Sequence, residues 1–129
     1  MVARFLLIIC LADLARSYST AWFARAVPED GTITTLEIDP KCVRVATESL
    51  TTAGLIHKVN IILGPAVETI ETLSPAPTPF DLVFIDADKE GNVTYFKHAK
   101  RLVRKGGVIV CNFATYSCPN AKVIDRLHD

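Results

Sequence analysis

Short apolar segments rich in β-branched residues alternate along this chain with segments whose apolar side chains recur at helical spacing. The apolar segments predict strands, at Phe5–Leu11, Thr32–Ile38, Lys58–Leu63, Phe80–Ile85 and Val108–Phe113. The intervening segments predict helices, at Thr20–Val27, from Pro40 to a stop at Gly54, at Pro65–Leu73 and at Gly91–Val103, with a loop and one further helix after the last strand. This alternation is typical of right-handed βαβ units, and it predicts an α/β fold with a doubly wound, mostly parallel sheet.

The length and charge of the chain limit its organisation and its partners. A chain of 129 residues suits one domain, and no repeat or linker divides residues 1–129. The 14 Lys and Arg residues balance 14 Asp and Glu residues, so the formal net charge is zero. Binding to nucleic acid or to an anionic membrane usually depends on a strong positive field, so we expect neither partner.

The cysteine pattern predicts a reducing compartment. Cys10, Cys42, Cys111 and Cys118 form no C-x-x-C pair, and no group of Cys and His has the spacing of a zinc site. We therefore expect free thiols in a cytoplasmic protein.

The apolar run near the amino terminus has two interpretations. Arg4 followed by Phe5–Ala12 resembles a short secretory signal, with a positive start and an apolar stretch of suitable length. A buried parallel strand has the same appearance, because both of its faces are covered. We favour the strand. The run is too short to span a membrane as a helix.

The segments after the first two strands hold the first candidate site residues, because ligands of such sheets bind beyond the carboxyl ends of the strands. No glycine occurs before Gly31, so the first loop lacks the usual nucleotide-binding feature. Ser19 offers a hydroxyl and an amide at a helix start, or it is a simple N-cap. Glu37 and Asp39 follow the second strand. One of these acids could accept hydrogen bonds from a ribose diol while the other caps the next helix.

The segments after the fourth and fifth strands offer oxygen ligands. Asp86, Asp88 and Lys89 stand together where the fourth strand ends. Carboxylates beside a lysine suit a hard cation and a substrate oxygen, although Asp88 could also be only a cap and Lys89 only a solvated side chain. Asn112 offers an amide oxygen after the fifth strand, whereas Phe113 offers no metal ligand.

Four segments carry a family resemblance, and they occur in order at 18–26, 34–41, 80–89 and 102–110. Together they resemble the cation-dependent, S-adenosylmethionine-using O-methyltransferases, the family of catechol and caffeoyl-CoA O-methyltransferases. The likeness covers Tyr18 to Phe113. It implies a Rossmann-like class I methyltransferase core. The family begins earlier, with helices, and continues into two more strands, so the core is expected to be incomplete at its carboxyl-terminal end.

The resemblance also implies roles for individual residues. Glu37 would hold the ribose hydroxyls of S-adenosylmethionine, and Ser19 would contact its methionine carboxylate. The stretch from Gly64 to Ala66 would lie along the adenine. Asp86 would take part in the catalytic and cofactor site as a metal ligand, and Lys89 would be the base that deprotonates the acceptor hydroxyl.

Two departures from the family pattern weaken parts of this site. Arg16 and Ser17 stand where two glycines are expected after the first strand. Asn112 and Phe113 stand where the family has an Asp-Asn pair of metal ligands. Asn112 therefore remains a candidate ligand of a weakened divalent cation site, with Mg²⁺ the expected ion.

The expected function is methyl transfer from S-adenosylmethionine to a small, hydroxylated, aromatic acceptor. The alternative is a catalytically inactive, truncated methyltransferase-like protein that acts as an interaction module. A nicotinamide-dependent oxidoreductase is disfavoured because G-x-G-x-x-G is missing after the first strand. The family topology would leave Val108–Phe113 as an apolar sheet edge. Because such edges recruit other strands, we expect a homodimer or aggregation unless the segment after Tyr116 covers the edge.

Overall fold

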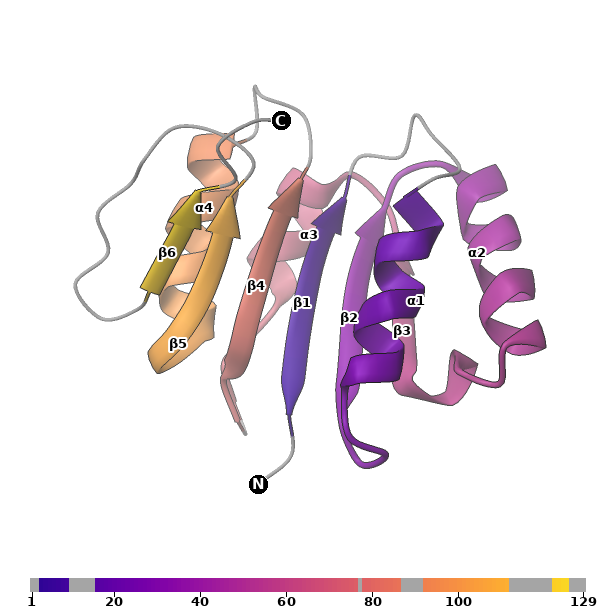
Figure 1. Cartoon of the computed structure of the whole chain (residues 1–129). Helices are drawn as coiled ribbons and strands as arrows, with labels where there is room; N and C mark the ends of the chain where they lie inside the picture. Colours follow the sequence, from indigo (N-terminus) through magenta and orange to yellow (C-terminus); the bar gives the residue numbers. More distant parts are fainter. Residues whose placement is uncertain (1–2, 10–15, 77, 87–91, 112–121, 126–129) are drawn as a thin grey trace.

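Within the described residues, six strands form one sheet in the computed structural model of the chain (Figure 1). The structure describes residues 3–9, 16–76, 78–86, 92–111 and 122–125. The strands are β1 (Arg4–Ile9), β2 (Thr32–Glu37), β3 (Val59–Leu63), β4 (Phe80–Asp86), β5 (Val103–Cys111) and β6 (Lys122–Asp125). Their order is β3-β2-β1-β4-β5-β6, and every pairing is parallel. The predicted parallel α/β sheet is therefore confirmed.

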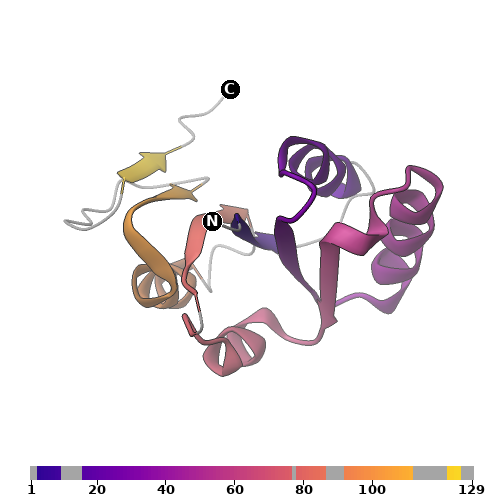
Figure 2. The same ribbon diagram turned by 90° about the horizontal axis from the view of Figure 1, so that it is seen from below.

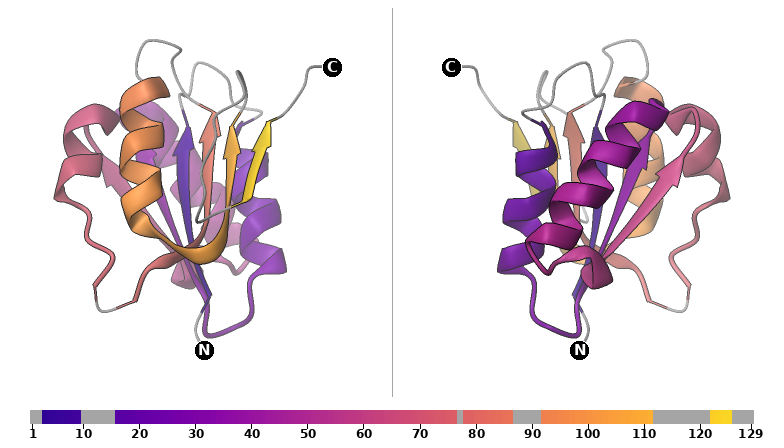
Figure 3. Two further views of the ribbon diagram at one scale, coloured as in Figure 1. Left: turned by 90° about the vertical axis from the view of Figure 1, so that its left-hand side faces the viewer. Right: turned by 90° about the vertical axis from the view of Figure 1, so that its right-hand side faces the viewer.

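Helices cover both faces of the sheet. Helices α1 (Arg16–Ala26) and α2 (Pro40–Thr52) lie on one face, and α3 (Ala66–Thr72) and α4 (Asn92–Leu102) lie on the other (Figures 2 and 3). A short 3₁₀ helix, η1 (Ile56–Lys58), precedes β3. This arrangement is the predicted doubly wound fold. None of the helices in the described ranges is both long and apolar enough to cross a membrane.

The apolar run near the amino terminus is a central strand. β1 lies between β2 and β4 and pairs with both along its length. Leu6 is fully buried, as expected for a strand with both faces covered. The strand interpretation of this run is therefore confirmed for Arg4–Ile9.

Helix α2 begins and ends where local sequence signals predict. Asp39 precedes it, and the Asp39 carboxylate accepts a hydrogen bond from the Lys41 amide at 2.9 Å. Pro40 occupies the first helical position, where its missing N–H is tolerated. Gly54 follows the helix with φ of +73°, a conformation that costs glycine little.

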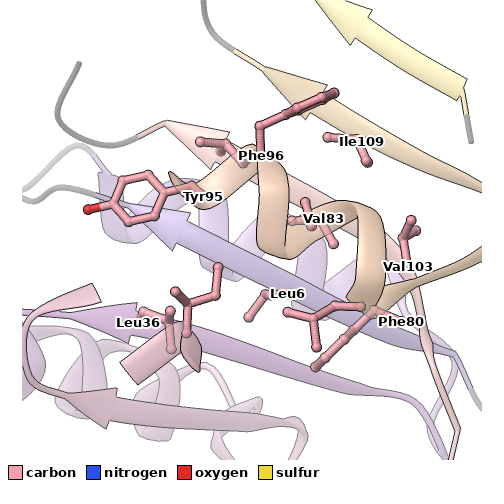
Figure 4. Packing of buried hydrophobic residues seen from close by; sticks show 12 residues of the cluster. Leu6, Leu36, Phe80, Val83, Tyr95, Phe96, Val103 and Ile109 are labelled. Atoms are coloured by element: carbon pink, nitrogen blue, oxygen red, sulfur yellow. The ribbon is translucent and has the colours of Figure 1, made fainter. Parts of the chain in front are cut away.

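The two faces of the sheet have different cores. On the α3/α4 face, a cluster of buried residues joins the sheet to both helices, and Figure 4 labels eight of them. The cluster consists of Leu6, Leu36, Ile70, Phe80, Val83, Ile85, Tyr95, Phe96, Ala99, Leu102, Val103 and Ile109. On the α1 face, the buried cluster is smaller and consists of Ala24, Val27, Ile33 and Phe84. The larger core holds most of the apolar burial.

Strand β5 begins earlier than the predicted start at Val108, and residues 105–107, which were expected to be the turn before the strand, belong to it. Helix α4 ends at Leu102 and the strand begins at Val103. The pairing with β4 shifts between Phe80↔Val103 and Leu82↔Val108, which marks a bulge. Gly106 has φ of +79°, and a Cβ on Gly107 would lie 2.6 Å from a Val103 methyl carbon. The two glycines therefore permit a bulge inside a strand rather than a turn before one.

The end of the chain also differs from prediction, since Lys122–Asp125 forms a strand rather than part of a helix. This strand, β6, pairs with β5 from Val108↔Lys122 to Cys111↔Asp125. A segment this short has no decisive periodicity, and its strand state depends on the partner. Because β6 covers β5, Val108–Cys111 is not a free edge. The homodimer was predicted from a free edge at this strand, so that reason for it no longer holds.

Candidate functional site

The candidate site lies at the edge of the sheet where the parallel strands end. Strands β2, β3 and β4 end there at Glu37, Leu63 and Asp86, and the arrowheads in Figure 1 mark this edge. Helices α2 and α3 begin within three residues of the ends of β2 and β3. Side chains and backbone groups that are distant in sequence are thus brought to one edge.

Glu37 is the most buried acid described at this edge. Its side chain is only 2 % exposed, although it is a charged residue. Its Oε1 accepts hydrogen bonds from the amides of Ile38 at 3.1 Å and Asp39 at 3.3 Å. Buried carboxylates require such donors. These two amides orient the carboxylate at the end of the strand.

The neighbouring acid has a different role. Asp39 caps helix α2 through the amide of Lys41, and its side chain is half-buried. Of the two acids considered for ribose, the structure assigns capping to Asp39. Glu37 therefore remains the candidate for a ligand.

Gly64 connects β3 to α3 and lies beside Glu37. Its amide donates a hydrogen bond to the backbone carbonyl of Glu37 at 2.7 Å. Its φ of +150° favours glycine, and a Cβ there would lie 3.2 Å from Thr69 Oγ1. Pro65 follows as the N-cap and Ala66 is the first residue of α3. The structure thus brings together Glu37, Gly64 and Ala66, three of the residues predicted to hold the cofactor.

Two exposed apolar residues at this edge were not predicted as site residues. Ile38 is 58 % exposed and Leu63 is 50 % exposed. Leu63 pairs with Glu37 in the sheet, so both residues flank the same acid. One feature of the sequence could have indicated this apolar surface: Ile38 stands between two acids at the end of a strand.

The pKa of Cys42 indicates that the region around Asp39 and Glu37 carries a negative field. Burial, followed by the nearby carboxylates of Asp39 and Glu37, raises the pKa of the Cys42 thiol, and a hydrogen bond with Asp39 acts in the same direction. The thiol is therefore protonated at neutral pH. The negative field of the two acids favours ligands that donate hydrogen bonds and disfavours anions at this point.

Ser19 lies inside a helix rather than at its start. Helix α1 begins at Arg16, so Arg16 and Ser17, which replace the expected glycines, are its first two residues. The predicted start at Thr20 and the alternative of Ser19 as an N-cap are wrong. The segment Arg-Ser-Tyr-Ser has no apolar periodicity that would reveal its helical state. The Ser19 side chain lies outside the described part of the structure.

The catalytic and metal-ligand predictions are not tested. Asp86 is the last residue of β4 and pairs with Ile9, but its side chain lies outside the described part. Lys89 and Asn112 lie outside the described residues altogether, as do Asp88 and Phe113. Among the residues that are described, no three His, Cys, Asp or Glu side chains group around a common point.

Comparison with known proteins agrees with this arrangement. The profile of the O-methyltransferase family matches residues 12–125. The chain is 50% identical over 93 residues to a catechol O-methyltransferase of Mycobacterium tuberculosis, covering 72% of this chain and 41% of that protein. It is 44% identical over 106 residues to a catechol O-methyltransferase of Niastella koreensis, covering 81% and 48%.

A solved structure shows the same fold. The O-methyltransferase TomG of Streptomyces achromogenes, in complex with SAM, superposes with a TM-score of 0.76 at 38% identity, covering 84% of this chain and 47% of that one. The chain thus spans less than half the length of each of these three relatives. The family profile nevertheless covers residues 12–125, most of this chain. This chain belongs to the O-methyltransferase family.

Proposed function

We propose that this chain binds S-adenosylmethionine at the edge formed by β2 and β3 and transfers its methyl group to the hydroxyl of a small, hydroxylated, aromatic acceptor. The observation that carries the proposal is the position of Glu37 at the end of β2: its carboxylate is buried, and its backbone carbonyl accepts a hydrogen bond from the Gly64 amide. Family membership and the SAM complex of TomG support the choice of cofactor.

The residues at this edge fit an adenosine group. A carboxylate accepts two hydrogen bonds from a diol, which matches the role assigned to Glu37. Gly64 presents no side chain at the point where β3 ends. The exposed apolar surfaces of Ile38 and Leu63 suit a planar base. We assign the ribose to Glu37 and the adenine to Gly64 and Ala66, with Ser19 for the methionine carboxylate.

In the proposed reaction, the bound cofactor supplies an electrophilic methyl group on a sulfonium. Lys89 Nζ, in its neutral form, takes the proton of the acceptor hydroxyl. The acceptor oxygen forms a bond to the methyl carbon as the sulfur–methyl bond breaks. The sulfur keeps that electron pair, and the products are a methyl ether and S-adenosylhomocysteine. Asp86, the last residue of β4, is the proposed metal ligand beside the acceptor.

Calorimetric titration with S-adenosylmethionine tests the cofactor assignment. Removing the charge of the Glu37 carboxylate should cost about 1.5–3 kcal/mol of binding, so we expect Glu37→Gln to bind at least about tenfold more weakly. Glu48→Gln, a matched change on the exposed face of α2, should bind as the wild type does. Equal affinity in Glu37→Gln would reject the ribose assignment.

The same titration addresses the alternative function. Absence of binding by the wild-type chain would favour the inactive interaction module. This alternative is supported by Arg16 and Ser17, which occupy the first turn of α1. Side chains at these positions replace the glycines that usually allow a close approach to the cofactor.

We also propose a weakened Mg²⁺ site with Asp86 and Asn112 as ligands. Two carboxylates reduced to one leave fewer charged oxygens than Mg²⁺ favours. The double variant Asn112→Asp with Phe113→Asn should therefore gain a Mg²⁺-dependent rise in melting temperature that the wild type shows weakly, since a ligand that binds only the folded state stabilises it. A double variant whose melting curve ignores Mg²⁺ would reject this placement.

The proposed acceptor is a small molecule rather than a macromolecule. The balanced charge of the chain offers no general field for nucleic acid or an anionic membrane. The relatives named catechol O-methyltransferase support the aromatic class. We place the enzyme in the cytoplasm on the basis of its cysteine pattern. A panel of catechols and simpler phenols, assayed with labelled S-adenosylmethionine, tests the acceptor class.

A further inference from the structure

Helix α3 is short, yet it leads directly out of the loop assigned to the adenine. It contains seven residues, and Gly64 and Pro65 immediately precede it. A helix of this length is not stable alone. One of its side chains, Ile70, is fully buried in the large core, and Ala66 and Leu73 at its two ends pack partly against that core. The position of α3, and of the loop before it, therefore depends on tertiary contacts.

Arg101 of helix α4 hydrogen-bonds to the carboxyl-terminal end of α3. Its Nη1 donates to the Leu73 carbonyl at 2.8 Å, and its Nη2 donates to the Ile70 carbonyl at 2.9 Å. Leu73 is the C-cap of α3, and its amide also donates to the Ile70 carbonyl at 3.3 Å. Carbonyls at a helix end lack their full set of helical partners, and a cation is favourable there. The two bonds use the planar fork of the guanidinium, which fixes direction as well as distance.

His98 holds the guanidinium in this orientation. Its Nδ1 accepts a hydrogen bond from Arg101 Nε at 2.9 Å, one helical turn away on α4. Burial and the Arg101 charge lower the pKa of His98, against the opposing effect of Glu71. The neutral ring is therefore favoured, and in its Nε2–H tautomer Nδ1 accepts the bond from Arg101.

The two ends of the segment 64–73 are thus tied to different elements. At its start, the Gly64 amide is bonded to the Glu37 carbonyl of β2. At its end, the Ile70 and Leu73 carbonyls are bonded to Arg101 of α4. Arg101 itself is exposed, so its contribution to the stability of the whole fold should be small. Its effect should instead fall on the position of α3.

We propose that Arg101 is a positioning residue for the cofactor: by bonding to the last carbonyls of α3, it holds the Gly64–Ala66 loop in place for the adenine. This inference rests on the proposed function, which places the adenine on that loop. Arg101 lies on α4, far along the chain from the 64–66 loop, and its proposed effect on the ligand passes through α3. It is therefore a positioning residue and not a catalytic one.

The test compares Arg101→Ala with a matched arginine change. Arg104→Ala removes an exposed arginine that bonds to Asp81 at 2.7 Å. Asp81 lies near the start of β4, at the edge of the sheet opposite the candidate site. Affinity for S-adenosylmethionine is measured by calorimetry. We expect Arg101→Ala to weaken binding about tenfold, within the range of coupling through contacts remote from a ligand. Arg104→Ala should bind as the wild type does, and both variants should melt within a few degrees of each other.

Two further measurements separate positioning from general destabilisation. In the ligand-free chain, Arg101→Ala should speed hydrogen exchange of the α3 amides and leave those of α2 unchanged. Arg101→Lys should recover part of the affinity, because an ammonium can bond to one carbonyl but cannot reproduce the fork. Rescue by lysine and local exchange are effects that a purely structural loss would not produce.

The outcomes distinguish this inference from the function on which it rests. A wild-type chain that fails to bind S-adenosylmethionine would overturn the proposed function and the positioning role with it. A wild type that binds, together with an Arg101→Ala variant of equal affinity, would overturn the positioning role alone. Unchanged exchange in α3 would overturn it as well.

Discussion

The two faces of the sheet are stabilised in different ways. On the α3/α4 face, a continuous cluster of twelve buried residues joins four strands to both helices, and the charged contact of Arg101 lies at its exposed rim. On the α1 face, four buried apolar residues form the cluster, and the buried set also includes a lysine, Lys58, that is 7% exposed. Where few apolar residues are buried, hydrogen bonds from a buried charged group help to hold a helix in position.

Lys58 bonds to the end of α1 as Arg101 bonds to the end of α3. Its ammonium donates to the carbonyls of Ala24 at 3.1 Å and Val27 at 3.0 Å. The Glu29 carboxylate lies 3.5 Å away and also contacts His57 at 2.7 Å. Both cations therefore satisfy helix-end carbonyls, but one is buried and the other exposed. Because of this difference in burial, we expect the contact of Lys58 to affect global stability and that of Arg101 to affect the local position of α3.

The largest effect is expected in the larger core. Phe80 is 1% exposed on the α3/α4 face, and Phe80→Ala should destabilise the fold by about 3–5 kcal/mol, because it removes apolar contacts and leaves a cavity. Phe23→Ala, on the half-buried aromatic group of the α1 face, should cost about half as much. Urea denaturation measures both. Equal losses would show that the two cores contribute equally to stability, contrary to this expectation.

A smaller effect is expected for the buried lysine. Lys58→Met keeps the length of the side chain but leaves the Ala24 and Val27 carbonyls without their donor, so we expect a loss of about 2–3 kcal/mol in urea denaturation. Lys97→Met, on the exposed face of α4, should change stability by no more than about 0.5 kcal/mol. A more stable Lys58→Met variant would show that apolar packing serves this face better than the charge does.

The smallest effect concerns the exposed acid beside Lys58. A hydrogen bond with His57, and then the charges of Lys58 and His57, lower the pKa of Glu29 below its ordinary 4.5. A carboxylate whose pKa is lower in the folded than in the unfolded state adds stability above the unfolded value. That stability is lost as the pH falls through the folded value. Glu29→Gln should therefore be slightly less stable than the wild type at pH 7.

The pH dependence provides the check on this prediction. The difference between the urea midpoints of the wild type and Glu29→Gln should shrink as the pH is lowered below 4.5. His57→Gln, which leaves the carboxylate in place, serves as a control for the contribution of its hydrogen-bond partner. A difference that grows at low pH would contradict the assigned role of Glu29.

Local signals were sufficient for most of the elements. The apolar runs predict β2, β3 and β4 to within a residue of their observed bounds, because buried parallel strands carry their own β-branched pattern. The start of α2 follows from Asp39 and Pro40 alone. The candidate acid Glu37 could likewise be found from its place at the end of a strand.

Other features depend on contacts between segments distant in the sequence. The state of β6 depends on its pairing with β5. At the bulge in β5, a Cβ on Gly107 would crowd the Val103 side chain and the Asp81 carbonyl, so glycine is required there by contacts that form only in the fold. The first turn of α1 has no apolar period, so its helical state could not be read from its residues. The exposed apolar pair at the site edge, Ile38 and Leu63, comes together only when β2 and β3 pair.

Periodicity, caps and motifs are local properties, so the alternation of strands and helices, the parallel sheet and the family resemblance could be inferred from the sequence without the fold. Only the tertiary structure decided which acid is buried at the site edge, where Glu37 meets Gly64, and which cations satisfy helix ends. The sequence does not show whether a lysine or an arginine is solvated or hydrogen-bonded to another part of the fold. Lys58 is buried because the end of α1 lies against it, more than 30 residues away in the chain.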